Sequence, residues 1–258
     1  MNAKKLSFLL LILVAVACTN RSTSSEQDEM RHWNNVLQQI NALLLENKAR
    51  QTLDLAKQTL PEILESAEKN GTTDTLIYYA RKIFNACGNN YINTKQYKDG
   101  IDYMDSIGNH PLIREHCPHE LLSFKAGLNQ LYGNNPEAVR LAEDYLQLPV
   151  CTSANDFIRQ AEIISGVYMY SGNNLPKAIQ ILEKAIDVYR KGGNFPNMLR
   201  IMSRLGIYYH LSGEYEKAIA TNQEAIATYN DSIAPGNVVI AYGEQANLYA
   251  ELGMYDQA

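Results

Sequence analysis

The densest group of side chains that could bind a metal ion lies near the middle of the chain. The run 115–120 carries carboxylates, imidazoles and a thiol, from Glu115, His116, Cys117, His119 and Glu120. A zinc site takes about four ligands and usually draws on two clusters, but no second cluster accompanies this run. Pro118 favours a break between helices here. We interpret the run as a solvent-exposed connection, with a metal site as the alternative, and we predict no cofactor.

Motifs for catalysis are missing from the sequence. No segment has the pattern of a nucleophile elbow, a phosphate-binding loop or a paired-histidine metal site. The triplet Gly-Asn-Asn recurs at 88–90, 133–135 and 172–174. At 133 and 172 it suits helix ends and turns, because Gly and Asn tolerate positive φ angles. We therefore predict that the chain is not an enzyme.

The composition excludes several classes of protein. Hydrophobic residues make up 46% and charged residues 20% of the 258 residues, which is enough apolar material for a core. The formal net charge is −5, so we expect no nucleic-acid partner. Alternating runs of Val, Ile and Thr are absent, which argues against an all-β fold. Tyr is abundant, with 17 copies against 5 Phe and 1 Trp.

The first residues have the pattern of an export signal. Lys4 and Lys5 precede the run 6–17, which is apolar except for Ser7. A helix needs about 20 apolar residues to span a bilayer, so residues 1–17 are predicted to be a removable signal peptide. Its removal would leave 21 basic and 28 acidic side chains, a net charge of −7.

The end of this segment resembles the cleavage box of bacterial lipoproteins. Small residues at Ala15 and Ala17 precede Cys18, although Ala15 stands where that box usually has Leu. The resemblance implies lipidation at Cys18, a flexible tether over residues 18–31, and an exported, membrane-anchored protein that faces the periplasm or the cell surface. An ordinary signal peptide and an uncleaved anchor are the alternatives.

Three further cysteines, Cys87, Cys117 and Cys151, follow Cys18. An odd number does not form a disulfide framework. A single bridge between Cys117 and Cys151 is left open, because export would permit it. Cys87 falls on the apolar face of a predicted helix, so we expect it to be buried.

An apolar stripe with helical spacing recurs every 38 to 40 residues. One copy consists of Leu175, Ala178, Ile179, Leu182, Ala185, Ile186 and Tyr189, and six of the seven positions are again apolar 40 residues later. The small residue of the stripe recurs at Gly100, Ala138, Ala178, Ala218 and Ala258. A preceding helix has a small residue, an aromatic residue three later and a turn residue four after that, as in Gly206, Tyr209 and Gly213. The small residues would allow close helix packing, and Gly would end the first helix with a positive φ angle.

This pattern resembles the tetratricopeptide repeat family, although the usual period of that family is 34 residues. The resemblance implies an all-α, right-handed α-solenoid of stacked helix hairpins. It covers residues 76–258 as about five units, the last of them truncated. The aromatic residue of the first helix is Tyr91, Tyr168, Tyr209 or Tyr249 in four of the units, and we call this place in the repeat the Tyr position. In the unit around 121–131 the Tyr position holds either Leu128 or Asn129. Residues 32–75 are predicted to be a divergent N-terminal cap in which Pro61 bends or splits a helix and Trp33 packs in the core.

Solenoids of this family bind partners on a concave surface that their first helices line. By analogy with the family, the groove positions in this chain are Lys82, Asn85, Asn89, Arg159, Glu162, Arg200, Ser203 and His210. Ile92, Met169 and Ile207 share these positions. The mixed polarity favours a protein or peptide partner over a lipid. Plain exposed helix surface is the alternative for each residue, and the sequence leaves the oligomeric state open.

The sequence supports several functions of the binding class. A lipoprotein-like start, long Tyr-rich repeats and an end within a unit resemble the envelope sensory arrays of Bacteroidetes signalling regulators. That hypothesis implies a piece of a longer protein in which a membrane-spanning helix and an output domain follow Ala258. A lipid-anchored nutrient-binding protein of the SusD type is the alternative, but the polar connections offer none of its aromatic platforms. A standalone assembly scaffold is the third hypothesis.

Overall fold

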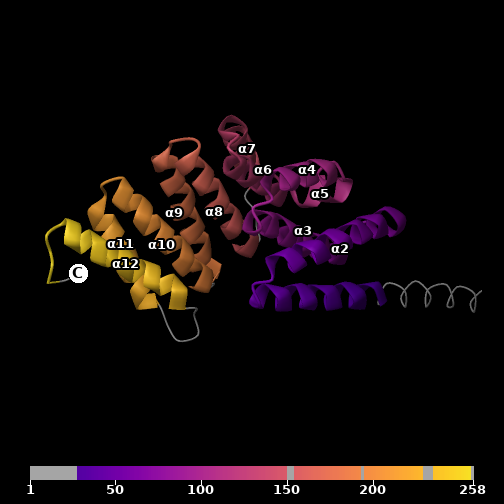
Figure 1. Ribbon diagram of the computed structural model, residues 1–258, viewed down its shortest axis with the longest axis horizontal. Coiled ribbons are helices and arrows are strands. Elements are labelled where there is room, and N and C mark those ends of the chain that lie inside the picture. Colours follow the sequence, from indigo (N-terminus) through magenta and orange to yellow (C-terminus); the bar gives the residue numbers. More distant parts are fainter. Residues whose placement is uncertain (1–27, 150–153, 193–194, 229–234, 257–258) are drawn as a thin grey trace, which may run out of the picture. The chain divides into compact units, whose positions relative to one another are not determined.

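The computed structural model describes residues 28–149, 154–192, 195–228 and 235–256. Every regular element in these ranges is a helix, as the sequence predicts (Figure 1). No helix in these ranges is long and apolar enough to cross a membrane. The predicted signal peptide, the lipidation site Cys18 and most of the tether lie outside the described residues, as does Cys151.

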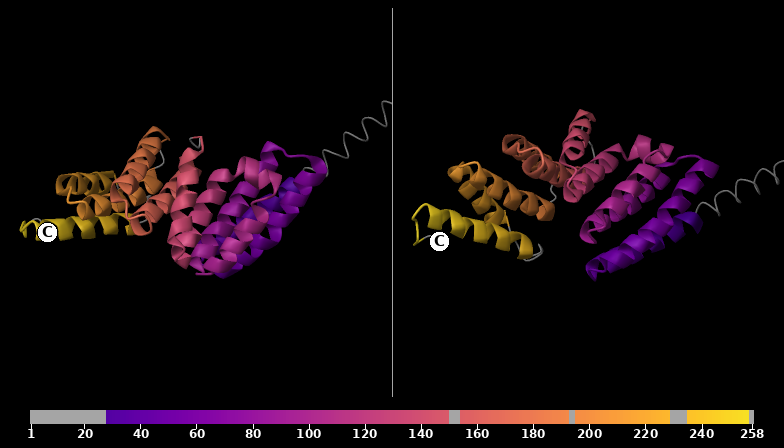
Figure 2. Two further views of the ribbon diagram at one scale, coloured as in Figure 1. Left: turned by 90° about the horizontal axis from the view of Figure 1, so that it is seen from above. Right: turned by 45° about the horizontal axis from the view of Figure 1, so that its top comes forward.

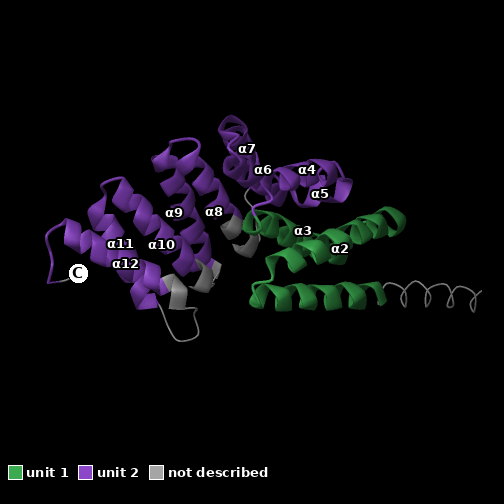
Figure 3. Ribbon diagram, viewed as in Figure 1, with its two compact units in different colours: residues 1–94 green, residues 95–258 purple. Residues whose placement is uncertain are grey.

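The chain divides into two compact units, Met1–Thr94 and Lys95–Ala258 (Figure 3). In unit 1 a helix covers residues 28–45, followed by α2 (Ala49–Asn70) and α3 (Asp74–Asn93). Trp33 is buried, and its ring centroid lies 5.9 Å from that of Tyr79 on α3. The first helix of the predicted repeat array, α3, therefore belongs to the same unit as the segment that precedes it.

The helix α2 runs unbroken through Pro61. Of the two effects predicted for Pro61, bending or splitting the helix, splitting is therefore wrong. Pro61 lies on the exposed side of α2, where water can satisfy the carbonyl group that loses its partner. The opposite side is buried and holds the predicted apolar stripe of Leu53, Ala56, Leu60, Ile63, Leu64 and Ala67.

Unit 2 is an α-solenoid of stacked helix hairpins. It begins with α4 (Tyr97–Ile107) and the short α5 (Pro111–His116). Three hairpins follow: α6 (Pro118–Tyr132) with α7 (Asn135–Gln147), α8 (Ala154–Tyr170) with α9 (Leu175–Gly192), and α10 (Phe195–Leu211) with α11 (Tyr215–Thr228). The helix α12 (Pro235–Glu251) comes last. The first helices α6, α8, α10 and α12 pack on one another in this order, and each second helix also contacts the next first helix (Figure 2). We call the layer of α6, α8, α10 and α12 the first-helix layer.

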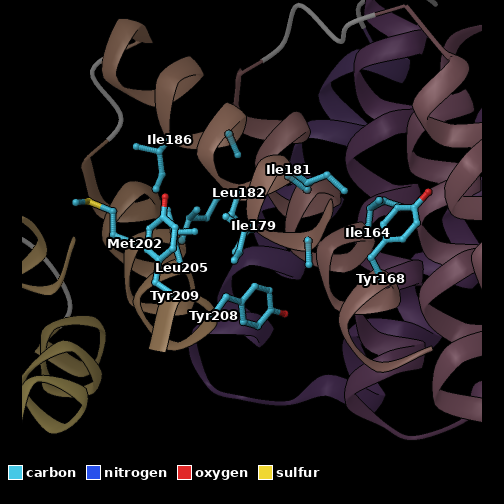
Figure 4. Close-up of a cluster of buried hydrophobic side chains, with 14 of the residues drawn as sticks. Ile164, Tyr168, Ile179, Ile181, Leu182, Ile186, Met202, Leu205, Tyr208 and Tyr209 are labelled. Atoms are coloured by element: carbon cyan, nitrogen blue, oxygen red, sulfur yellow. The ribbon is translucent and has the colours of Figure 1, made fainter. Parts of the chain in front are cut away.

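The recurring small residues lie where the second helix of each hairpin packs on its first helix. Ala138, Ala178 and Ala218 have no exposed surface. The contact is closest at Gly206 on α10, where an added Cβ atom would lie 2.2 Å from the amide oxygen of Asn222 on α11. Side chains of α8, α9 and α10 fill the core beside these contacts, including the repeat tyrosines Tyr168 and Tyr209 (Figure 4).

The helix ends identify the register of the unit around 121–131, in which the sequence left the Tyr position open. Gly133, Gly213 and Gly253 adopt positive φ angles of 96°, 78° and 72°. The backbone N–H of the following residue donates to the carbonyl oxygen of Asn129, Tyr209 or Tyr249, at 2.8, 2.9 and 2.8 Å. These are Schellman caps. Asn129 therefore occupies the Tyr position of its unit, and Leu128 does not.

The turn after α8 differs from the prediction. Asn173, and not Gly172, adopts the positive φ angle, 44°. The N–H of Asn174 reaches back to the carbonyl oxygen of Tyr168 at 2.9 Å, so this turn holds one residue more than the turns at Gly133 and Gly213. The extra residue accounts for the spacing of ten residues between Tyr168 and Ala178, where Tyr209 and Ala218 are nine apart.

Candidate binding surface

The predicted groove residues fall into both units. Lys82, Asn85 and Asn89 lie on α3 in unit 1 and are half-buried. The ammonium nitrogen of Lys82 lies 5.7 Å from the ring centroid of Tyr78. The remaining predicted groove residues lie on α8 and α10 in unit 2, and the side chain of Arg159 is outside the described part.

An ion pair joins α8 and α10 on the first-helix layer. Nη2 of Arg200 lies 2.8 Å from Oε2 of Glu162. The Glu162 side chain is 3% exposed and the Arg200 side chain 38%. Nη1 of Arg204, one helical turn further along α10, donates to the backbone carbonyl of Glu162 at 3.4 Å. Glu162 is thus a buried carboxylate that fixes a partly exposed arginine side chain. We call Glu162, Arg200 and Arg204 the α8–α10 seam.

Two buried phenols lie beside this seam. Burial raises the pKa of Tyr189, and the positive charge of Arg200 only partly offsets it. Burial likewise raises the pKa of Tyr208, against the charge of Arg204. Both hydroxyl groups therefore stay protonated and can donate hydrogen bonds at neutral pH. The Tyr189 hydroxyl has no hydrogen-bond partner among the described residues.

Ser203 does not contribute to the exposed surface. Its side chain is buried, and its hydroxyl donates to the carbonyl oxygen of Leu199 in the preceding turn at 2.9 Å. Glu162 is also buried. Both residues were predicted to face a partner, but in this structure they support the surface from below.

His210 links α10 to α12. Its Nε2 lies 2.6 Å from Oε2 of Glu251, and its Nδ1 lies 3.3 Å from Oε2 of Glu244. The Tyr215 hydroxyl donates to the other oxygen of Glu251 at 3.2 Å. Burial lowers the pKa of His210, but the hydrogen bonds to Glu251 and Glu244 outweigh it and raise the pKa above the usual 6.5. His210 therefore links the first helices α10 and α12.

Three exposed apolar residues recur at one repeat position that the sequence prediction missed. Leu131, Tyr170 and Leu211 each lie two residues after the Tyr position and are 42%, 68% and 57% exposed. Tyr170 and Leu211 are the last residues of α8 and α10, and Leu131 is the last residue but one of α6. The sequence could have identified them, because an apolar residue recurs two places after the Tyr position, at the exposed end of each of these helices. Ile207 and Met169 on the same helices are half-buried.

The second helices α7, α9 and α11 form the other layer of unit 2, which we call the second-helix layer. A cavity of about 330 Å³ opens on this side. It lies between α9 and α11 over α10. Its floor is apolar, and Arg190 spans it, with its Nη2 donating to both carboxylate oxygens of Glu224 at 2.7 and 2.8 Å. The Tyr209 hydroxyl donates to Glu183 at 2.5 Å. The lining consists of Glu183, Ile186, Asp187, Arg190, Met202, Leu205, Tyr209, Thr221 and Glu224.

The run 115–120 is not a solvent-exposed connection. Its residues end α5 and begin α6, and both Cys117 and Glu120 are buried. Cys87 is buried on α3, as predicted. Pro118 stands at the first position of α6, where a missing N–H costs nothing, so the chain passes from one helix to the next almost without a loop. Across the described residues no group of three His, Cys, Asp or Glu side chains is arranged to hold a metal ion.

Comparisons with known proteins agree with this fold. Residues 161–231 match the family model described as tetratricopeptide repeat. The crystal structure of BtubC (BKLC) from P. vanneervenii superposes with a TM-score of 0.63 at 11% identity, over 81% of this chain and 86% of that chain. The putative kinesin light chain of Podosopora anserina, with nearly identical TPR-like repeats, gives a TM-score of 0.48 at 12% identity, over 76% and 93%. No curated protein matches the chain. Residues 161–231, which include most of α8 and all of α9, α10 and α11, therefore carry the tetratricopeptide repeat pattern within an α-solenoid.

Proposed function

We propose that the chain is a non-catalytic module that binds an extended segment of a partner protein along the first-helix layer of unit 2. The observation that carries the proposal is the ion pair between Arg200 and Glu162. A buried carboxylate holds the head of an arginine side chain that keeps more than a third of its surface exposed, although its Nε atom is buried. Arginine groups fixed in this way suit carboxylates, because they can offer two parallel N–H donors.

Exposed groups elsewhere on α8 and α10 define the chemistry of the partner. Tyr170 and Leu211 supply apolar surface at the ends of α8 and α10. The seam supplies positive charge from Arg200 and Arg204. Leu211 lies eleven residues, or about 16 Å, along α10 from Arg200. An extended partner segment with an acidic side chain several residues away from apolar side chains would satisfy both. Aromatic and arginine side chains are the types that dominate binding energy at protein interfaces.

Charge reversal tests this assignment. The variant Arg200→Glu is compared with Arg190→Glu, which also breaks an ion pair between helices but lies on α9 in the second-helix layer. Both variants are cross-linked in cells of the native source and purified under denaturing conditions. We expect the wild type and Arg190→Glu to retain the same cross-linked partner, and Arg200→Glu to lose it. Equal recovery by all three proteins would reject the first-helix layer as the site.

We further propose that this module is exposed in the cell envelope on a lipid anchor at Cys18, as the sensory or scaffolding part of a larger signalling protein. The support is the sequence of residues 1–18, a charged start, an apolar run and small residues before a cysteine. Lipid chains on Cys18 would hold the protein at the membrane. Cys18→Ala should shift the protein from the membrane fraction to the soluble fraction. An unchanged distribution would reject the anchor.

A further inference from the structure

The cavity between α9 and α11 has more acidic than basic groups in its lining. Glu183 and Asp187 on α9 and Glu224 on α11 supply three carboxylates, and Arg190 on α9 supplies one guanidinium group. Three negative charges and one positive charge give the lining a formal net charge of −2. A ligand with two positive charges would complement this cavity.

The contacts within the cavity leave Glu183 without a cationic partner. The Nη2 atom of Arg190 donates to both oxygens of Glu224, and its Nη1 atom lies 3.5 Å from Oδ1 of Asp187. Glu183 accepts a hydrogen bond from the Tyr209 hydroxyl, but it forms no ion pair within the described residues. Burial and the hydrogen bond to Glu183 raise the pKa of Tyr209, so this phenol stays protonated and neutral. The charge of Glu183 is therefore not neutralised inside the cavity.

A further ion pair close to the cavity adds no net charge. Lys217 on α11 is not part of the lining, but its Nζ atom lies 5.3 Å from the ring centroid of Tyr209, which is. The same Nζ atom lies 2.5 Å from a carboxylate oxygen of Glu214. The hydrogen bond to Glu214 raises the pKa of Lys217, so both members of this pair stay charged. The excess of negative charge in the cavity consequently remains.

The floor of the cavity suits a chain of methylene groups. It contains the buried side chains of Ile186 on α9 and of Met202 and Leu205 on α10 (Figure 4). A methylene chain that lies on this floor is removed from water, which favours its binding. A hydrated metal ion takes oxygen ligands and gains nothing from an apolar surface. The volume of about 330 Å³ is at the lower end of the range for small-molecule sites.

We propose that this cavity binds a small aliphatic diamine, a molecule with two ammonium groups on a short methylene chain. One ammonium group lies between Glu183 and Asp187, which are one turn apart on α9. The methylene chain lies on the apolar floor, and the second ammonium group shares the Glu224 carboxylate with Arg190. The cavity belongs to the second-helix layer, so this proposal does not depend on partner binding along the first-helix layer.

The methyl group of Met202 reports binding at this place, because Met202 lines the cavity. The full chain is labelled with carbon-13 in the methionine methyl groups, and Met202→Leu and Met104→Leu assign the two resonances in the NMR spectrum. The probe is cadaverine, a five-carbon chain with an ammonium group at each end. We expect cadaverine to shift the Met202 resonance saturably, and to leave unchanged that of Met104, which is buried on α4.

Three related compounds separate the contributions of charge and chain. Pentylamine has the same chain but one ammonium group, so it should bind about fivefold more weakly than cadaverine. Pentanediol, with a hydroxyl group at each end, should not shift the Met202 resonance. Mg²⁺, which has the charge but no apolar part, should not shift it either. Binding of pentanediol or of Mg²⁺ with the affinity of cadaverine would overturn the proposal.

Variants of the chain locate the ammonium groups. Glu183→Gln should weaken the binding of cadaverine about fivefold, because it removes the carboxylate that has no cationic partner. Arg190→Gln should strengthen the binding about threefold, since it removes the competing cation. Glu216→Gln is the matched control, because Glu216 is exposed on α11 outside the cavity, and it should bind as the wild type does. An unchanged Met104 resonance shows that each variant is folded.

Two results with these variants would reject the site. The first is the absence of a saturable shift at Met202 in the wild type. The second is equal weakening by Glu183→Gln and Glu216→Gln, which would mean that cadaverine responds only to the overall negative charge of the chain.

Discussion

Arg200 on α10 and Glu162 on α8 form an ion pair of 2.8 Å in which the acid is buried and the base is partly exposed. The asymmetry gives the two partners different roles. Glu162 sets the position of the guanidinium group, and Arg200 presents it at the surface. The ion pair also connects two successive repeats, and it therefore contributes both to stability and to the proposed binding surface.

Substitution of Arg200 should therefore affect stability as well as binding. Arg200→Ala removes the positive charge from a carboxylate with 3% exposure, so we expect the free energy of unfolding to fall by about 1–3 kcal/mol. Arg190→Ala, whose pair with Glu224 is about half exposed on both sides, should cost less than about 1 kcal/mol. Urea unfolding of the two variants measures the difference. Equal losses would show that the burial of Glu162 is unimportant.

The contact between Gly206 and Asn222 predicts a coupled pair of substitutions. Gly206→Ala should destabilise the chain by about 1–3 kcal/mol, because its Cβ atom would overlap the Asn222 amide. Asn222→Ala alone should be close to neutral, since both polar atoms of the buried amide lack a hydrogen-bond partner. In the Asn222→Ala background, Gly206→Ala should cost at least about 1 kcal/mol less than in the wild type. Additive effects in this double-mutant cycle would contradict the close approach.

Attachment of α12 should depend on pH through His210. The raised pKa of His210 means that its contribution is complete below the usual 6.5 and is lost as the pH rises through the folded-state pKa. The hydrogen bond from His210 lowers the pKa of Glu251 below 4.5, so that contribution is lost as the pH falls through this lower value. The protection factors of the α12 amides, which are exchange rates corrected for the intrinsic rate at each pH, should therefore be highest between about pH 4.5 and 6.5.

His210→Gln is the control for this pH dependence, because Gln keeps a hydrogen-bonding side chain but does not titrate. The variant should lose the rise in exchange protection of α12 between pH 8 and pH 6, after correction for intrinsic exchange rates, while α8 and α9 behave as in the wild type. An unchanged profile in His210→Gln would assign the pH dependence to other groups.

Two glycines should respond oppositely to alanine. Gly213 has a φ angle of 78°, so Gly213→Ala should cost about 1–2 kcal/mol, because L-residues are strained in that region. Gly243 lies within α12 with nothing close to its missing Cβ atom, and Gly243→Ala should stabilise by about 0.5–1 kcal/mol. Thermal unfolding of both variants provides the measurement. Destabilisation by Gly243→Ala would mean that this side of α12 is covered.

The hairpins were predictable because their signals are local. The spacing of Tyr209, Gly213 and Ala218 fixes a helix, its end and the seat of the next helix within ten residues. The prediction went wrong where a single residue changed the geometry without changing the pattern. At the end of α8 both Gly172 and Asn173 tolerate a positive φ angle, and only the longer turn selects Asn173.

The candidate surface was less predictable, because its contacts join residues that are far apart in the sequence. Because glutamate side chains are usually exposed to water, the sequence predicts an exposed Glu162. In the structure the stacking of α8 on α10 buries Glu162, which pairs with Arg200 of the next repeat. His210 meets Glu244 and Glu251 only because α12 stacks on α10. Periodicity identifies which residues lie on a helix face, and the packing of the next helix decides which of them stay exposed.

Site-specific photo-cross-linking tests the central claim most directly. A photoreactive amino acid is placed at Ile207, on α10 in the first-helix layer, or at Lys184, an exposed position on α9 in the second-helix layer. The protein is expressed in its native cells and irradiated. We predict one partner adduct from position 207 that disappears when Arg200→Glu is added, and none from position 184. An adduct from position 184 but not from 207 would contradict binding along the first-helix layer.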